Sequence, residues 1–117
     1  MTRKMVILDK EKIIPTDYPR YNSARDLARA KQIGDINFEG VVLEDTGDGN
    51  LYVKFGHHRI ARALEIGLRT AIEVEVVEAS EQAKMDIRGA RYTFEKNGEL
   101  RNYDEYIERI RWLRGEI

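Results

Sequence analysis

A single glycine joins a strand pattern to a helix pattern near the middle of the chain, and this junction constrains the fold more than any other feature. Residues 51–55 (LYVKF) carry the β-branched and aromatic side chains typical of a strand. After Gly56, apolar residues recur at helical spacing: Ile60, Ala61, Leu64 and Leu68. No linker separates the two patterns. The chain must therefore turn directly from a strand into a helix, and this indicates a fold that mixes both elements.

Further strand and helix patterns flank this junction. We expect a strand at 5–8, an extended segment at 13–15 and a helix from Ser23 to Gly34. Next come strands at 41–43 and 51–55, joined by the Gly- and Asp-rich loop 45–50, which we interpret as a solvated hairpin. After the helix that ends near Gly67, we expect a strand at 72–76 and helices at 80–87 and 103–114. The order predicts a mixed α/β (α+β) fold.

Length and composition fit one globular domain. The chain has 117 residues, 42% of them hydrophobic, which suffices for a single core. No apolar run approaches the roughly 18 residues needed to cross a membrane, and the charged N-terminus does not resemble a signal peptide. Because Cys is absent, disulfides and thiolate chemistry are excluded, and we expect a cytoplasmic protein. The net charge of −1 argues against coating nucleic acid by charge alone.

The start of the helix after Gly56 carries two histidines and an arginine. The first backbone N–H groups of a helix have no partner inside the helix, and the helix dipole makes that end positive. Gly56 would let an anion approach the backbone, and Arg59 would add a fork suited to phosphate oxygens. These residue types are compatible with a phosphate site at Gly56, His57, His58 and Arg59. The alternative is a polar first turn that only begins a helix.

The same residues resemble the signature of the ParB/sulfiredoxin superfamily. The run Gly56-His57-His58-Arg59, followed by Ala63, Gly67 and an Ile-Glu-Val strand, is similar to its glycine–arginine turn. The resemblance covers roughly residues 5–91 and leaves a helical extension at 92–117. It implies one compact domain over 1–117, with a small mixed sheet, flanking helices and a bound nucleotide phosphate.

Branches of this superfamily differ in residues that can be checked here. Sulfiredoxins need a cysteine beside the turn, so their chemistry is excluded. Free-serine kinases carry an acid just before the turn, where this chain has Phe55, and a glutamate upstream, for which Asp17 is the nearest counterpart. Kinase activity is therefore a minor alternative. Partition proteins of the ParB type bind CTP with an upstream arginine, matched by Arg20, and a later segment, where Arg88 and Arg91 fall without the family's Glu-Asn pair.

Partition proteins also follow this domain with a helix-turn-helix and a dimerisation domain, whereas only a turn and one helix follow Arg91 here. The resemblance is thus to the nucleotide-binding domain alone, such as plasmids, phages and archaea often encode. We expect binding of CTP or ATP with Mg²⁺, followed by slow hydrolysis or a nucleotide switch. Gly56, His57, His58, Arg59, Arg20, Arg88 and Arg91 would hold the phosphates.

Three residues are candidates for catalysis. Asp17 would hold the metal or orient water, and its alternative is a turn-forming aspartate. His57 and His58 titrate near neutrality and could move protons, or they could merely lie in the first turn of the helix.

Two further functions stay open at this point. One is a ParB-like DNA nuclease or DNA-binding accessory protein. The other is a non-catalytic module that binds a protein partner, or a second copy, through the C-terminal helix, where Trp112 lies off the apolar stripe. The basic and aromatic residues of that helix could contact nucleic acid, but acids on the same helix dilute its charge.

Overall fold

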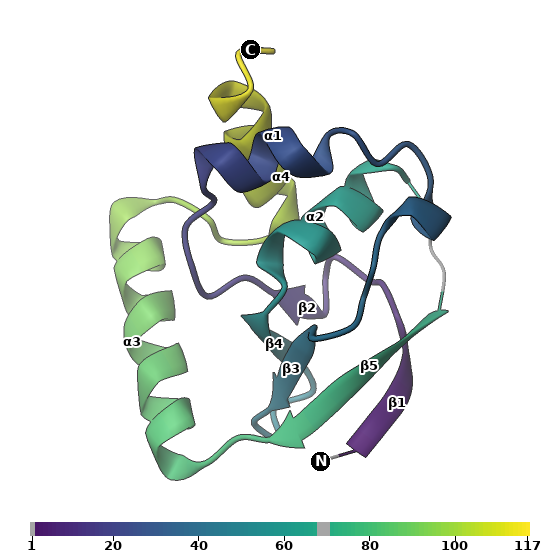
Figure 1. The fold of residues 1–117 in the computed structure, drawn as a ribbon. Coiled ribbons are helices and arrows are strands. Elements are labelled where there is room, and N and C mark those ends of the chain that lie inside the picture. Colours follow the sequence, from purple (N-terminus) through teal and green to yellow (C-terminus); the bar gives the residue numbers. More distant parts are fainter. Residues whose placement is uncertain (1, 68–70) are drawn as a thin grey trace.

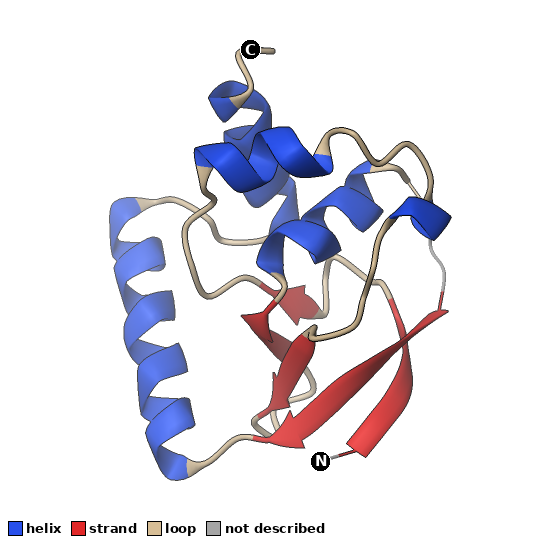
Figure 2. Cartoon of the chain, viewed as in Figure 1, coloured by secondary structure: helices blue, strands red, loops and turns tan. Residues whose placement is uncertain are grey.

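The computed structural model describes residues 2–67 and 71–117 and shows an α+β domain built on a five-stranded sheet. The strands are β1 (Thr2–Ile7), β2 (Ile13–Ile14), β3 (Val42–Asp45), β4 (Leu51–Phe55) and β5 (Ala71–Glu78). Their order across the sheet is β1-β5-β3-β4-β2 (Figure 2).

The sheet is mixed. The β1 strand runs antiparallel to β5, and β3 and β4 form an antiparallel hairpin. By contrast, β3 is parallel to β5 and β2 is parallel to β4. The predicted fold class, a small mixed sheet with flanking helices, is confirmed.

Four α-helices lie around the sheet within the described residues: α1 (Tyr21–Leu27), α2 (His57–Glu65), α3 (Glu81–Asn97) and α4 (Tyr103–Leu113). A short 3₁₀ turn, η1, covers Ile33–Asp35. Helices α1, α2 and α4 contact one another and gather on one side of the sheet, whereas α3 stands apart (Figure 1). Within the described residues, no helix has both the length and the apolar character needed to cross a membrane.

The core lies between the sheet and the three gathered helices. Leu43, Val53 and Val74 project from the sheet and are buried, as are Ile60 and Ala61 of α2. Helix α4 adds three buried side chains to this cluster: Tyr103, Tyr106 and Ile110. The segment predicted as an extension thus shares the core of the residues before it.

The first helix differs from the prediction at both ends. It begins at Tyr21 rather than Ser23, and regular α-helix ends at Leu27 rather than near Gly34. The guanidinium of Arg62 donates hydrogen bonds to the carbonyls of Ala28 and Ala30. These two carbonyls therefore have side-chain donors in place of helical N–H partners. Regular α-helix thus ends where Arg62, a residue distant in the sequence, donates hydrogen bonds to the backbone carbonyls.

The third helix is longer than predicted. Ser80 begins it as expected, since its hydroxyl accepts a hydrogen bond from the Ala83 N–H. The helix then continues past Ile87 to Asn97 and ends at Gly98, whose φ of 65° is left-handed. Phe94 is buried against Tyr18, with the ring centroids 5.0 Å apart, and this contact holds the last turns.

The other predicted helix ends agree with the structure where it describes them. Helix α4 begins after Asn102, whose side chain accepts the Glu105 N–H, and runs to Leu113. Gly67 follows α2 with a left-handed φ of 87°. Leu68, predicted on the apolar face of that helix, lies outside the described residues.

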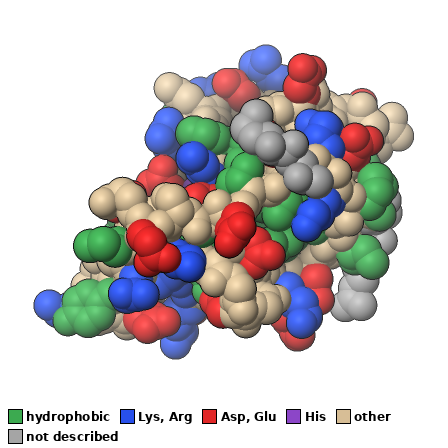
Figure 3. Space-filling model, turned by 90° about the horizontal axis from the view of Figure 1, so that it is seen from below, with side chains coloured by type: hydrophobic (Ala, Val, Ile, Leu, Met, Phe, Trp, Pro, Cys, Tyr) green, Lys and Arg blue, Asp and Glu red, His purple; other side chains and the backbone are tan. Residues whose placement is uncertain are grey.

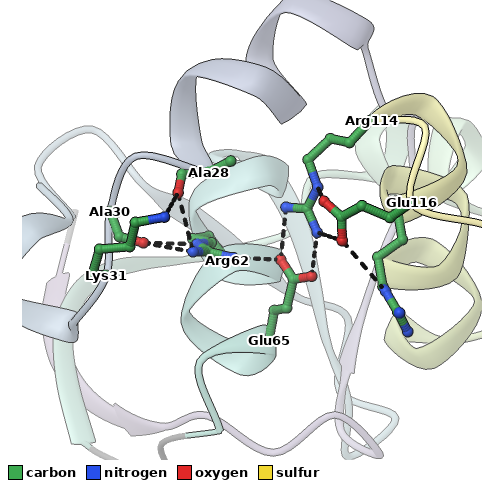
Figure 4. A network of polar contacts seen from close by, with 8 residues as sticks. Ala28, Ala30, Lys31, Arg62, Glu65, Arg114 and Glu116 are labelled. Atoms are coloured by element: carbon green, nitrogen blue, oxygen red, sulfur yellow. Dashed lines mark hydrogen bonds and ion pairs between the residues drawn. The ribbon is translucent and has the colours of Figure 1, made fainter.

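Buried ion pairs fix the end of α2 against the end of α4. Arg114, whose side chain is 7% exposed, donates two hydrogen bonds to the carboxylate of Glu65. Glu65 also accepts from Arg62 at 2.9 Å, and Glu116 pairs with Arg114 (Figure 4). Burial alone would raise the pKa of Glu65, but the hydrogen bonds from both arginines outweigh it and lower that pKa.

Seen from below, the surface carries basic and acidic side chains interspersed with hydrophobic ones (Figure 3). On the edge strand β1, Met5 and Ile7 are exposed, and Arg3 pairs with Glu73 of β5. This view therefore shows no continuous basic surface of the kind that tracks a nucleic-acid backbone.

Candidate functional site

A cleft of about 460 Å³ opens at the N-terminus of α2. Its walls come from that first turn, the segment 17–20, α1, the end of β4 and one residue of α4. Six of the predicted site residues line it: Asp17, Arg20, Gly56, His57, His58 and Arg59. Residues far apart in the sequence are thus brought to one place.

The first turn of α2 begins at Gly56, for two physical reasons. Its φ of 97° is left-handed, which favours glycine. A Cβ on Gly56 would lie 2.6 Å from the Cγ2 of Val41, a buried residue that precedes β3. The side that lacks a Cβ therefore faces the core, and the glycine allows close packing rather than the approach of an anion from that side.

The backbone N–H groups at the start of α2 are free for a ligand. No described residue accepts a hydrogen bond from the N–H of His57, His58 or Arg59, and Gly56 has no side chain to bind them. The next N–H, that of Ile60, bonds to the Gly56 carbonyl. Three donors at the positive end of a helix thus border the cleft.

His57 holds the segment before Pro19 against α2. Its Nε2 accepts a hydrogen bond of 3.0 Å from the Thr16 N–H, while the Thr16 hydroxyl donates to the Val53 carbonyl at 2.6 Å. Burial lowers the pKa of His57 to about 4, so the ring is neutral at pH 7. A nitrogen that accepts a backbone N–H in this way is not free to take up a proton from a ligand.

His58 makes the same kind of contact one residue later. Its Nε2 accepts a hydrogen bond of 2.8 Å from the Arg20 N–H. Burial lowers the pKa of His58 to about 4, and the positive charge of Arg20 adds to this effect. The two predicted acid–base residues thus fasten the segment 16–20 to the helix as neutral acceptors. A catalytic role for the two histidines stays a prediction.

Arg59 lines the cleft, but its guanidinium is already engaged. Nη1 donates to the carbonyls of Asn37, at 3.1 Å, and Glu39. Two carbonyls of the loop before β3 therefore occupy one nitrogen of the fork that was predicted to hold phosphate, while Nε and Nη2 make no hydrogen bond with any described residue.

Asp17 and Arg20 form the rim of the cleft. Their side chains are 55% and 76% exposed, and Arg20 Nη2 lies 3.6 Å from Asp17 Oδ2. Asp17 Oδ1 also accepts a hydrogen bond of 2.8 Å from the N–H of the adjacent Tyr18. The loose, exposed pair leaves both groups able to turn toward a ligand.

Arg88 and Arg91 do not line this cleft. Arg91 donates to the carbonyls of Pro15, Leu100 and Arg101, so it joins the residue before Thr16 to the segment that precedes α4. Arg88 lies on α3 beside a separate cavity. The structure therefore does not bring these two arginines together with the first turn of α2.

Several residues of the cleft were not singled out from the sequence. Lys54 lies with its Nζ 5.6 Å from the centre of the Phe55 ring, and both line the cleft, as does Asp26 of α1. The position of Lys54, two residues before Gly56, could have indicated that its side chain lies near the first turn of α2. Tyr106 of α4 also lines the cleft, and no local signal could place it there because the packing of α4 against α2 is a long-range contact.

No protein-family model, curated protein or solved structure matches this chain. The resemblance to the ParB/sulfiredoxin superfamily therefore stays a prediction that rests on the Gly56–Arg59 turn and the order of elements around it.

Proposed function

We propose that this protein binds the phosphate groups of a nucleotide, CTP or ATP, at the N-terminus of α2. One observation carries the proposal: His57, His58 and Arg59, whose N–H groups have no acceptor among the described residues, line a cleft that is also lined by two exposed cations, Arg20 and Lys54. Helix N-termini with free N–H groups bind anions, and nearby cations strengthen that binding.

An exposed aromatic ring supports a nucleotide rather than a simple phosphate. Phe55 lines the same cleft and is 57% exposed, directly before the glycine turn. A flat exposed ring next to a phosphate site offers a surface on which a base can stack. The residue that replaces the kinase acid would thus serve recognition of the base.

The acids of the cleft fit a magnesium ion bound together with the nucleotide. Mg²⁺ is usually held by one or two carboxylates and by phosphate oxygens. Asp17 and Asp26 both line the cleft and are exposed. Among the residues that the structure describes, no three acids or histidines cluster as a metal site, so the phosphates would complete the shell. The ion would offset phosphate charge, and Asp17 would orient water if hydrolysis follows.

Isothermal titration with CTP and ATP, each with and without Mg²⁺, tests the proposal. We expect the double variant Arg20→Ala/Lys54→Ala to bind roughly tenfold more weakly or worse, since a hydrogen bond to a charged group contributes about 1.5–3 kcal/mol. Both side chains are exposed, so the fold should persist. Lys12→Ala is the matched control because it removes an exposed cation that lies outside the cleft.

The outcomes separate cleanly. Binding that is lost in the double variant and kept in Lys12→Ala supports the site, and release of inorganic phosphate on incubation would show hydrolysis. Equal affinity in both variants, or no binding of either nucleotide by the wild type, would overturn the proposal. Phe55→Ala should weaken binding of CTP and ATP while leaving that of inorganic pyrophosphate unchanged.

A further inference from the structure

The hydroxyl group of Tyr106 is buried beside the cleft without a partner. Tyr106 projects from α4, is 0% exposed and borders the cleft. Its hydroxyl makes no hydrogen bond with any described residue. Tyr103, one turn earlier on the same helix, is equally buried but donates to the His57 carbonyl at 3.4 Å. Buried hydroxyl groups normally have a hydrogen-bond partner, so the unpaired hydroxyl of Tyr106 needs an explanation.

A second unpartnered polar atom lies on the neighbouring ring. The Nδ1 atom of His58 is buried and makes no hydrogen bond within the described part of the chain. Since Nε2 accepts the Arg20 N–H, the hydrogen of the neutral ring is on Nδ1, which makes this atom a donor. The rings of His58 and Tyr106 meet edge to face, with their centroids 5.8 Å apart.

Both groups stay donors at physiological pH. Burial, together with the negative charge of Asp17, raises the pKa of Tyr106 well above its ordinary value, so the hydroxyl keeps its hydrogen. The charged groups that act on it are Asp17 and Arg20 from the rim, and His57 stacks beside it at 6.2 Å. Two neutral donors with no acceptor between them suit a ligand atom that accepts hydrogen bonds.

We propose that Tyr106 Oη–H and His58 Nδ1–H form a two-donor subsite at the floor of the cleft, which binds an oxygen of a phosphoryl group. The inference rests on the proposed nucleotide site and adds the floor residue from α4 to it. The free N–H groups of α2 would bind other oxygens of the same phosphate chain.

The ion pair between Asp17 and Arg20 at the rim of the cleft is loose enough to open to a ligand. Asp17 and Arg20 are largely exposed and joined only by the 3.6 Å ion pair. A phosphate that enters the cleft would draw Arg20 away from Asp17, because the charge-assisted bond of Arg20 to phosphate replaces a weak exposed pair. Binding would thus pair the two orphaned donors.

The test compares two buried tyrosines, of which one has a hydroxyl with a hydrogen-bond partner and the other has a hydroxyl without one. Tyr106→Phe removes the unpartnered hydroxyl, and Tyr103→Phe removes the partnered one. Affinity for ATP, CTP and inorganic pyrophosphate is measured by isothermal titration, and Tm without ligand is measured for each variant. We expect Tyr106→Phe to bind about tenfold more weakly with an unchanged or higher Tm. Tyr103→Phe should show a lower Tm and unchanged affinity.

His58→Gln provides a second variant on the other donor. The glutamine amide oxygen can still accept the Arg20 N–H, while the donor at the Nδ1 position is lost. We expect weaker binding, and the combined variant with Tyr106→Phe should lose less than the sum of the two, because both donors act on one oxygen.

Each outcome decides a separate point. Weaker binding of both nucleotides and pyrophosphate by Tyr106→Phe supports the subsite. Wild-type affinity in Tyr106→Phe overturns the subsite and leaves the proposed function standing. Weaker binding of nucleotide but not of pyrophosphate overturns the assignment to a phosphoryl oxygen. Absence of any binding by the wild type overturns the proposed function and the subsite together.

Discussion

The Nε2 atom of His58 accepts a hydrogen bond of 2.8 Å from the backbone N–H of Arg20, and this contact places the cationic rim over the first turn of α2. His57 does the same for Thr16 at 3.0 Å. Both bonds require the unprotonated ring, so the attachment of the segment 16–20 depends on pH.

We predict that the free energy of unfolding falls as the pH drops from 6.5 toward 4. The folded-state pKa of both histidines is about 4, against an ordinary value of 6.5. The unfolded chain therefore binds protons in this window while the folded chain does not, so the stabilisation is complete above pH 6.5 and is lost below it. For His57 the loss amounts to roughly 3 kcal/mol, and for the less buried His58 to less.

Urea denaturation at pH 7.5, 6.5, 5.5 and 5.0 measures this effect. Staying at or above pH 5 separates it from Glu65 and the other carboxylates, whose lowered pKa values matter only nearer their ordinary value of 4.5. A His57→Gln/His58→Gln variant, which keeps two acceptors that do not titrate, should show a flat profile. Stability of the wild type that stays constant from pH 7.5 to 5.0 would contradict the attachment described here.

We predict that Gly56→Ala lowers the free energy of unfolding by about 2–4 kcal/mol, because it combines a left-handed backbone with a clash in the core. The new Cβ would lie 2.6 Å from Val41 Cγ2. Gly49→Ala is the matched control, since its φ of 91° is similar but nothing lies within 4 Å of the added Cβ. It should cost only about 1 kcal/mol. Equal losses would show that Val41 does not fix the glycine.

The Gly56 example shows what sequence reasoning could and could not reach. The strand-to-helix turn was predictable, because the apolar pattern changes period at one glycine. The reason for the glycine was not, because Val41 lies in the segment just before β3 and only the folded packing brings its methyl group close. The start of α3 at Ser80 followed from a local signal, whereas the small mixed sheet was expected only from the family resemblance.

The partners that long side chains bind in the folded protein could not be predicted from local sequence signals. The position of Arg59 predicted a phosphate contact, yet two loop carbonyls occupy its guanidinium. Arg91 was expected in the site and instead binds three carbonyls behind it. A long flexible side chain reaches partners decided by tertiary structure, whereas the helix N-terminus follows from the chain's own backbone.

We predict that Glu65→Gln lowers the free energy of unfolding by about 3 kcal/mol at pH 7, because it takes the buried carboxylate away from Arg114 and Arg62 and leaves Arg114 only the more exposed Glu116. Glu73→Gln breaks the exposed pair with Arg3 and should cost less than about 1 kcal/mol. Because the folded-state pKa of Glu65 is lowered, its contribution is present above the unfolded-state value of 4.5 and is lost as the pH falls further. Thermal unfolding at pH 7 and pH 3.5 should show the Glu65→Gln variant moving toward the wild type at the lower pH. A Glu65→Gln loss no greater than that of Glu73→Gln would show that burial adds nothing to this pair.

We predict that Arg59 acts chiefly on the loop before β3. Arg59→Ala leaves the carbonyls of Asn37 and Glu39 without their donor, so amide hydrogen exchange in residues 37–41 should speed up, with a loss of roughly 1–3 kcal/mol in stability. Affinity for nucleotide should fall less than in the Arg20→Ala/Lys54→Ala variant, whose side chains are free to turn toward a ligand. Arg59→Lys, which keeps the charge but not the planar fork, should recover most of the affinity and little of the loop protection. If Arg59→Ala instead abolishes binding while exchange in 37–41 stays at the wild-type rate, the guanidinium leaves its carbonyls to bind phosphate directly.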